Sequence, residues 1–156
     1  MTQHQSVEES IQAFRQAEKW LFSLITDPKG ERYFQEKSME VRMTEFREQI
    51  ERMGSFLELI GSPQNSFPSI HVAGTSGKGS VVQMLASILR ANGLKTGYHV
   101  SPYLQVCLEK LIVDGKLIRP SEFAGLVAEF RAEFEAWTAH SERFDAIKYG
   151  EAWVAL

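Results

Sequence analysis

The chain has 156 residues, 44% of them hydrophobic and 24% charged, with a formal net charge of −3 at pH 7. This composition is typical of a globular domain and excludes a disordered or collagenous chain. The small negative charge argues against a nucleic-acid-binding surface, which requires concentrated Lys and Arg. We expect a cytoplasmic protein, because Cys107 is the single cysteine, and because neither a signal-peptide pattern nor an apolar run of about 20 residues is present.

Two helices are predicted within residues 1–62, which we expect to form a helical segment packed on the core. The first begins at Ser6, where Ser6 and Glu9 have the spacing of a capping box, and ends before residues 27–30. The second lies between a Ser38 cap and Gly61, and its apolar residues alternate steps of four and three. We interpret this stripe as a core face, with a two-stranded coiled coil as the alternative. It consists of Met39, Met43, Phe46, Ile50, Met53, Leu57 and Ile60.

A strand, a glycine-rich loop and a helix follow in residues 63–156, which we expect to be the start of an α/β domain. Residues 70–73 form a short apolar run between a proline and a glycine, which predicts a buried strand. A helix begins near Ser80 and ends at Asn92, and a second strand covers residues 96–100. The three elements predict a βαβ unit with parallel strands.

The remaining residues predict a loop, a hairpin and a helix. Ser101 and Pro102 open a loop at the carboxyl end of the second strand, and Asp114-Gly115 is a strong hairpin signal between two apolar runs. A helix starts at Pro120 and carries a further apolar pattern. Only two strands of the βαβ kind are predicted, whereas doubly wound domains have five or more, so we expect part of a longer domain.

The segment Gly74-Thr75-Ser76-Gly77-Lys78-Gly79-Ser80 is the strongest functional signal in the sequence. Glycines between a strand and a helix expose backbone N–H groups at the positive end of the helix, where an anion binds. Lys78 adds a full positive charge suited to the β- and γ-phosphates of a nucleotide. The spacing departs from the Walker pattern, because Gly79 stands where Ser or Thr is expected. A tight turn with a solvated lysine is the bland alternative.

These residues resemble a known family. The run from His71 to Ser80 is similar to the HVAGTNGKGS signature of folylpolyglutamate and dihydrofolate synthases, in the Mur ligase superfamily, and departs from it only at Ser76. Residues 101–104 resemble the family's SPHL segment, with Tyr103 in place of His, and residues 61–64 resemble its GNPQ element. The resemblance extends to residues 149–151, where the family has an aromatic pair followed by a glutamate.

The resemblance implies an incomplete P-loop NTPase-like α/β unit, of the Mur ligase central-domain type, preceded by two helices. It implies a ligase that uses ATP and Mg²⁺ to activate a folate or dihydropteroate carboxylate as an acyl phosphate and to join it to glutamate. Lys78 would be catalytic and bind phosphate, and Ser101 and Glu151 would bind Mg²⁺. The nucleotide would contact Gly74, Thr75, Ser76, Gly77, Lys78, Gly79 and Ser80.

Two other functions stay open at this point. The chain could be a non-catalytic nucleotide-binding or interaction module, or part of a Mur-type ligase that acts on a different carboxylate. The resemblance covers about the first third of a full-length ligase, so we expect these 156 residues to be inactive on their own. The expected partners are small molecules, with neither nucleic acid nor membrane among them.

Overall fold

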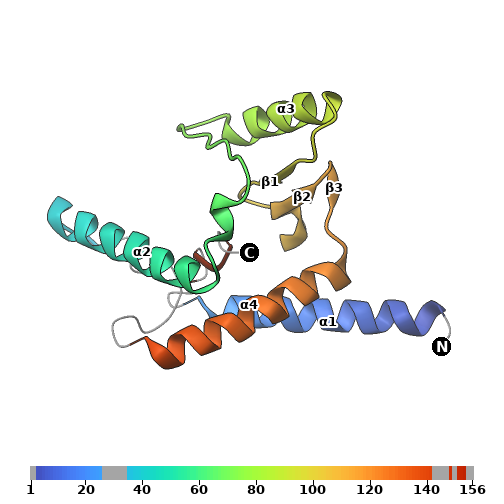
Figure 1. Ribbon diagram of the computed structural model, residues 1–156, viewed down its shortest axis with the longest axis horizontal. Coiled ribbons are helices and arrows are strands. Elements are labelled where there is room, and N and C mark those ends of the chain that lie inside the picture. Colours follow the sequence, from blue (N-terminus) through green and yellow to red (C-terminus); the bar gives the residue numbers. More distant parts are fainter. Residues whose placement is uncertain (1–2, 26–34, 142–147, 149–150, 154–156) are drawn as a thin grey trace. The chain divides into compact units, whose positions relative to one another are not determined.

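The structure is a computed structural model that describes residues 3–25, 35–141, 148 and 151–153 (Figure 1). Contacts divide the chain into two compact units, each built from two stretches of sequence. Unit 1 comprises Met1–Phe14 and Pro68–Ala124, and unit 2 comprises Arg15–Phe67 and Gly125–Leu156. The divisions fall inside α1 (Gln3–Ser23) and α4 (Pro120–His140).

Unit 1 contains a small antiparallel sheet in the order β1-β2-β3, with α3 beside β1 (Figure 1). The helix α3 spans Lys78–Ala91, and the strands are β1 (Gly97–His99), β2 (Leu111–Val113) and β3 (Lys116–Leu117). Tyr98 pairs with Ile112, which in turn pairs with Leu117. A 3₁₀ helix, η3 (Cys107–Lys110), leads into β2, and Cys107 in it is fully buried.

The predicted strand over residues 70–73 does not form, and the predicted parallel pairing with residues 96–100 is wrong for this structure. Within the described residues, β1 instead pairs antiparallel with β2. Ile70 is 63% exposed, so the apolar run is not buried either. The backbone groups of a strand need a partner strand, and among the described residues β1 finds its partner in β2, which no local feature of residues 70–73 indicates.

The hairpin predicted at Asp114-Gly115 is confirmed. Asp114 and Gly115 both have left-handed backbone conformations, with φ of 48° and 75°, and they connect β2 to β3. Two consecutive residues with positive φ are typical of the tight turns whose twist matches that of the flanking strands. The local sequence therefore determines this part of the sheet.

An aromatic cluster forms the core of unit 2. Phe56 is fully buried, and the centre of its ring lies 5.3 Å from the ring centre of Phe130 and 6.0 Å from that of Trp137. Trp20 contacts Phe130 and Phe134 edge to face, at 5.9 and 5.8 Å. Such pairs stabilise a core beyond the area they bury. The α2 helix (Met39–Leu59), the end of α1 and most of α4 are joined through these rings.

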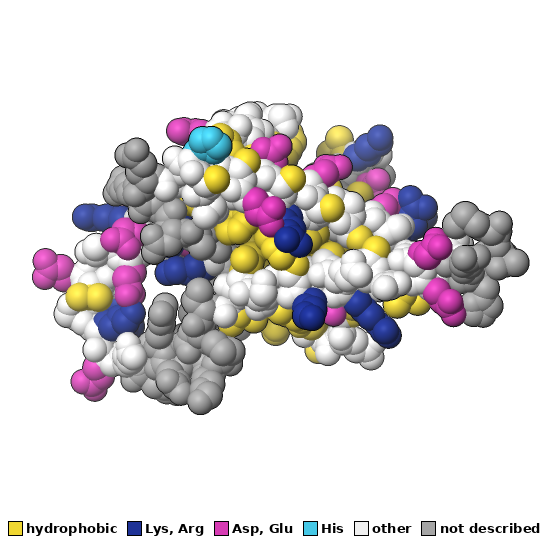
Figure 2. Space-filling view, turned by 90° about the horizontal axis from the view of Figure 1, so that it is seen from below, with side chains coloured by type: hydrophobic (Ala, Val, Ile, Leu, Met, Phe, Trp, Pro, Cys, Tyr) yellow, Lys and Arg dark blue, Asp and Glu magenta, His cyan; other side chains and the backbone are white. Residues whose placement is uncertain are grey.

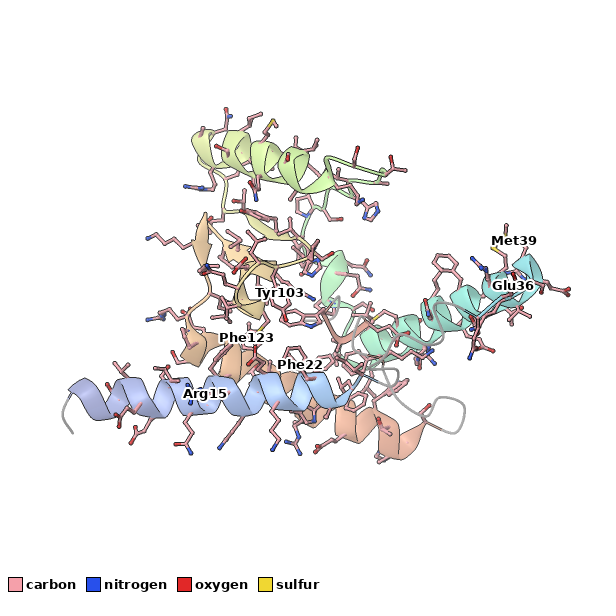
Figure 3. The ribbon with its side chains drawn as sticks, turned by 180° about the vertical axis from the view of Figure 1, so that it is seen from behind. Arg15, Phe22, Glu36, Met39, Tyr103 and Phe123 are labelled. Atoms are coloured by element: carbon pink, nitrogen blue, oxygen red, sulfur yellow. The ribbon has the colours of Figure 1, made fainter. Side chains whose placement is uncertain are left out.

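The apolar stripe of α2 is only partly a core face, which corrects the sequence interpretation. The Ser38 cap is confirmed, since its Oγ accepts a hydrogen bond from the Val41 N–H at 3.3 Å. Met53 and Leu57 are half-buried, but the first half of the stripe is exposed: Met39, Met43, Phe46 and Ile50. Figure 3 shows Met39 at the beginning of α2. Phe56, which lies outside the stripe, is the residue that enters the core.

The beginning of α1 also differs from prediction. The helix starts at Gln3, so Ser6 lies within it and does not cap it, and the predicted end at residues 27–30 lies outside the described residues. Val7 and Ile11 are exposed, and Figure 2 shows hydrophobic side chains on the surface among charged ones. Even so, none of the helices in the described part of the chain is both long and apolar enough to cross a bilayer.

Candidate nucleotide-binding site

The glycine-rich loop ends at the N-terminus of α3 with a left-handed residue. Gly77 has φ 73° and ψ −2° and is the N-cap, and the Val81 N–H donates to its carbonyl at 3.0 Å. The amides of residues 78–80 precede this first intrahelical bond, so the helix itself supplies no acceptor for them. These donors and the helix dipole together favour an anion at this point.

The three glycines of residues 74–80 differ in whether the backbone requires a glycine. Gly74 and Gly77 have positive φ, at 155° and 73°, which side-chain-bearing residues rarely adopt. Gly79 has no positive φ, and a Cβ built on it meets nothing within 4 Å. The chain by itself therefore does not require glycine at position 79. A ligand that approaches the backbone of the first helical turn would supply the missing reason.

Lys78 is the first residue of α3, and its ammonium group donates a hydrogen bond to the Gly74 carbonyl at 2.7 Å. The side chain therefore bends back across the loop that precedes it. Lys78 is exposed, as are all the other residues of 74–80 except the half-buried Gly79. The lysine charge is consequently held next to the helix N-terminus and is accessible to a dissolved anion.

Ser101 opens the loop that follows β1. It is exposed, and its peptide bond to Pro102 is cis. The Glu109 carboxylate organises the next turn, because it accepts backbone hydrogen bonds from Leu104, Gln105 and Val106 at 2.9, 2.9 and 3.0 Å. These bonds lower the pKa of Glu109. Glu109 was not among the predicted site residues, although a carboxylate three residues after an N-cap, here Val106, is a recognisable capping signal.

Two basic side chains lie close to this loop. Lys110 is only 9% exposed, and its ammonium group lies 5.6 Å from the ring centre of Tyr103. Burial lowers the pKa of Lys110. The pKa of His99 is lowered too, first by burial and then by the nearby charge of Lys110. Figure 3 labels Tyr103, whose ring faces this cation.

Glu151, the other predicted magnesium ligand, belongs to unit 2 and is bound by Arg52. Arg52 Nε and Nη2 donate to Glu151 Oε2 and Oε1 at 3.1 and 3.0 Å, and the Lys148 N–H donates to Oε2 at 2.9 Å. Ser101 and Glu151 offer oxygen donors, which suit Mg²⁺. Among the described residues, no three His, Cys, Asp or Glu side chains gather as a metal cluster. The magnesium roles of both residues therefore stay predictions.

Comparison with known proteins gives the site its context. No family model matches the sequence. The chain is 42% identical over 78 residues to the dihydrofolate synthase/folylpolyglutamate synthase of Mycobacterium tuberculosis, which covers 50% of this chain and 16% of that protein. It is 32% identical over 98 residues to the folylpolyglutamate synthase of Lacticaseibacillus casei, covering 63% of this chain and 23% of that protein.

The chain is related to the amino-terminal part of the folylpolyglutamate synthases. Its structure resembles the Mycobacterium tuberculosis folylpolyglutamate synthase complexed with ADP, with a TM-score of 0.73 and 28% identity over 94% of this chain and 28% of that one. A second structure of that enzyme, with ADP and AMPPCP, gives a TM-score of 0.64 at 32% identity over 74% of this chain and 27% of that one. These likenesses confirm the predicted relationship and an incomplete α/β unit of the Mur ligase type. The chain spans less than a quarter of the two curated relatives.

Proposed function

We propose that this chain is the ATP-binding amino-terminal portion of a ligase that joins a folate or dihydropteroate carboxylate to glutamate. One observation carries the proposal: the exposed loop 74–77 ends in left-handed Gly77 at the N-terminus of α3, directly before Lys78. The relatives bear the names of such synthases, and the solved neighbours contain adenine nucleotides. Within this proposal residues 1–62 form the helical segment and residues 63–156 begin the nucleotide-binding domain.

The proposed chemistry follows from the weakness of a carboxylate as an acyl donor. ATP transfers its γ-phosphoryl group to a carboxylate oxygen and leaves ADP. The glutamate amine then attacks the acyl carbon, loses a proton and expels inorganic phosphate. Lys78 and the backbone amides that follow Gly77 bind and orient the phosphates. Bound Mg²⁺ would neutralise phosphate charge, with Ser101 and Glu151 as its proposed protein ligands.

Isothermal titration calorimetry with ADP and Mg²⁺ tests the phosphate-binding step. Lys78→Ala is expected to weaken binding at least tenfold, since hydrogen bonds between charged groups contribute about 1.5–3 kcal/mol. Lys95→Ala is the matched control, because Lys95 is also exposed but lies in the loop after α3. Equal affinities for wild type and Lys78→Ala would remove the phosphate-binding role of the loop.

A ligase that acts on a different carboxylate is the alternative favoured by one observation. The synthases that this sequence resembles have histidine at the position of Tyr103. Here the Tyr103 ring packs against the buried Lys110. Thermal-shift measurements with dihydropteroate, folates and muropeptide precursors distinguish these substrates. Stabilisation by a muropeptide alone would favour a peptidoglycan ligase. Binding of nucleotide without any carboxylate ligand would favour a non-catalytic nucleotide-binding module.

A further inference from the structure

The first half of α2 is exposed on all of its faces. Every residue from Met39 to Glu48 is exposed, and so is Ile50. Four apolar side chains in this part of the helix, here called the α2 seam, are 75, 46, 56 and 57% exposed: Met39, Met43, Phe46 and Ile50. A helix in a protein owes most of its stability to the packing of its apolar face, so these turns gain little from the rest of the chain. The seam therefore marks a contact surface.

The α2 seam has the spacing of a two-stranded coiled coil. Its residues are separated by steps of four, three and four along the sequence. In a heptad, Met39 and Phe46 take the d positions, and Met43 and Ile50 take the a positions. Each a or d side chain of such a coil fits between side chains of the facing helix, so the partner must carry the same repeat. A second copy of α2 meets this requirement.

The charged residues beside the α2 seam disfavour a parallel pair of helices. Glu40 and Arg47 occupy the e positions of the heptad, and Arg42 and Gln49 occupy the g positions. In a parallel pair, each g residue faces the e residue that follows five positions later in the other helix, so Arg42 would face Arg47 on both sides of the coil. Two contacts between like charges oppose that arrangement.

The same charges favour one antiparallel register. Reversing one helix brings equivalent flanks together, so that e faces e and g faces g. The register that layers Met43 on Phe46 of the second copy also places Glu40 beside Arg47 of the second copy. The two-fold symmetry of such a pair repeats this attraction on the other side. A shift by one heptad would instead oppose either two copies of Arg47 or two copies of Glu40, so the charges select a single register.

We propose that the α2 seam binds the α2 seam of a second copy of this chain as a short antiparallel coiled coil. The contact is made by residues 39–50, a helical length of roughly 18 Å. This is small beside the interfaces of stable complexes, so the dimer is weak, with a dissociation constant on the order of 100 µM. The chain is monomeric in dilute solution and pairs as its concentration rises.

Sedimentation equilibrium tests the proposal on the 156-residue chain, over concentrations on both sides of this dissociation constant. Wild type is expected to change from monomer to dimer across the range. Phe46→Glu is expected to remain monomeric throughout, because it places two carboxylates inside the seam. Val41→Glu is the matched control, since Val41 is 46% exposed on the opposite side of α2 and its replacement should leave dimerisation unchanged.

A charge exchange tests the direction of the helices. Arg47→Glu is expected to raise the dissociation constant of the dimer about tenfold, because it turns two attractions with Glu40 into two repulsions. Adding Glu40→Arg to Arg47→Glu restores both attractions and should restore the dissociation constant of wild type. In a parallel pair, Arg47→Glu would face Arg42 and would strengthen the dimer instead.

Each other result overturns the proposal. A wild-type chain that stays monomeric at every concentration has no such contact, and a dimer that persists in Phe46→Glu forms through another surface. Stronger pairing in Arg47→Glu excludes the antiparallel register. Circular dichroism in dilute solution shows whether each variant folds, and Ile50→Gln, with the same expected loss of dimer, replaces Phe46→Glu if that variant does not. ADP is left out, so the outcome is independent of the proposed function.

Discussion

Asp114 and Thr96 are joined by two hydrogen bonds between the hairpin turn and the segment that enters β1. The Thr96 N–H donates to Asp114 Oδ1 at 2.8 Å, and the Asp114 N–H donates to the Thr96 carbonyl at 2.8 Å. The side chain and the backbone of one turn residue thus both bind the same neighbour. This contact extends the pairing of β1 with β2 by one residue beyond Gly97 and Val113.

Replacing Asp114 by alanine is expected to lower the free energy of unfolding by about 2 kcal/mol. The substitution removes the acceptor for the Thr96 N–H and places alanine at a φ of 48°, each at a cost of about 1 kcal/mol. Asp114→Asn is the control, because asparagine keeps a side-chain oxygen and tolerates this conformation. Urea denaturation measures both. An alanine variant as stable as the asparagine variant would contradict the assigned role of the carboxylate.

The aromatic core of unit 2 predicts a contrast between two phenylalanines on α2. Phe56→Ala is expected to cost about 3–5 kcal/mol of unfolding free energy, because the ring is fully buried against Phe130 and Trp137. Phe46→Ala makes the same chemical change at a residue that is 56% exposed, and its expected effect is within about 0.5 kcal/mol. Equal losses for the two variants would mean that the stripe of α2 is buried after all. Phe56→Leu serves where Phe56→Ala does not fold.

The glycines of the proposed phosphate-binding segment, residues 74–80, predict a separation between folding and binding. Gly77→Ala is expected to lower the free energy of unfolding by about 1–2 kcal/mol, since it forces a Cβ into left-handed backbone at φ 73°. Gly79→Ala should leave the free energy of unfolding unchanged or raise it by up to about 1 kcal/mol, because position 79 is helical and has room for a Cβ. ADP binding should nevertheless weaken in Gly79→Ala if phosphate approaches the backbone there. Full ADP affinity in Gly79→Ala would place the phosphate elsewhere.

Glu109 predicts an acid-dependent loosening of the loop after Ser101. Three backbone N–H bonds hold its pKa below the ordinary value of 4.5. A carboxyl whose pKa is depressed in the folded state stabilises that state above its unfolded pKa. The contribution is lost as the pH falls through the lower, folded pKa. The amide signals of Leu104, Gln105 and Val106, followed by NMR, should therefore shift together below pH 4.5.

Glu109→Gln is the matched variant for this pH dependence, because glutamine has nearly the same shape but does not titrate in this range. The concerted shift of the three amides should be absent in it. Glu122 also titrates in acid, with a pKa lowered to about 2 by Arg119, so the global melting temperature alone does not separate the two groups. Persistence of the amide shifts in Glu109→Gln would assign them to a different carboxylate.

Features that depend on neighbouring residues were predictable from the sequence. The Ser38 cap, the turn at Asp114-Gly115 and the start of α4 at Pro120 are confirmed, because capping bonds and positive φ values are satisfied within a few residues. The likeness to folylpolyglutamate synthases was predictable from the glycines and Lys78 of residues 74–80, whose phosphate-binding role stays a prediction.

Features that depend on which distant segments meet were decided by the tertiary structure. Residues 70–73 have a composition suited to a strand, yet β1 pairs with the hairpin that begins at Leu111. The apolar stripe of α2 includes Met39, which is exposed, and leaves out Phe56, which enters the core, because the aromatic residues of α4 pack against another face of the helix.

The Arg52–Glu151 pair gives the clearest physical reason for this division. Nothing in the local sequence around either residue indicates the other, since 99 residues separate them. A hydrogen bond within a turn or a cap is encoded by residues that are already close in the chain. An ion pair or a strand pairing across the fold exists only where packing has brought the partners together and has paid the entropy of closing the loop between them.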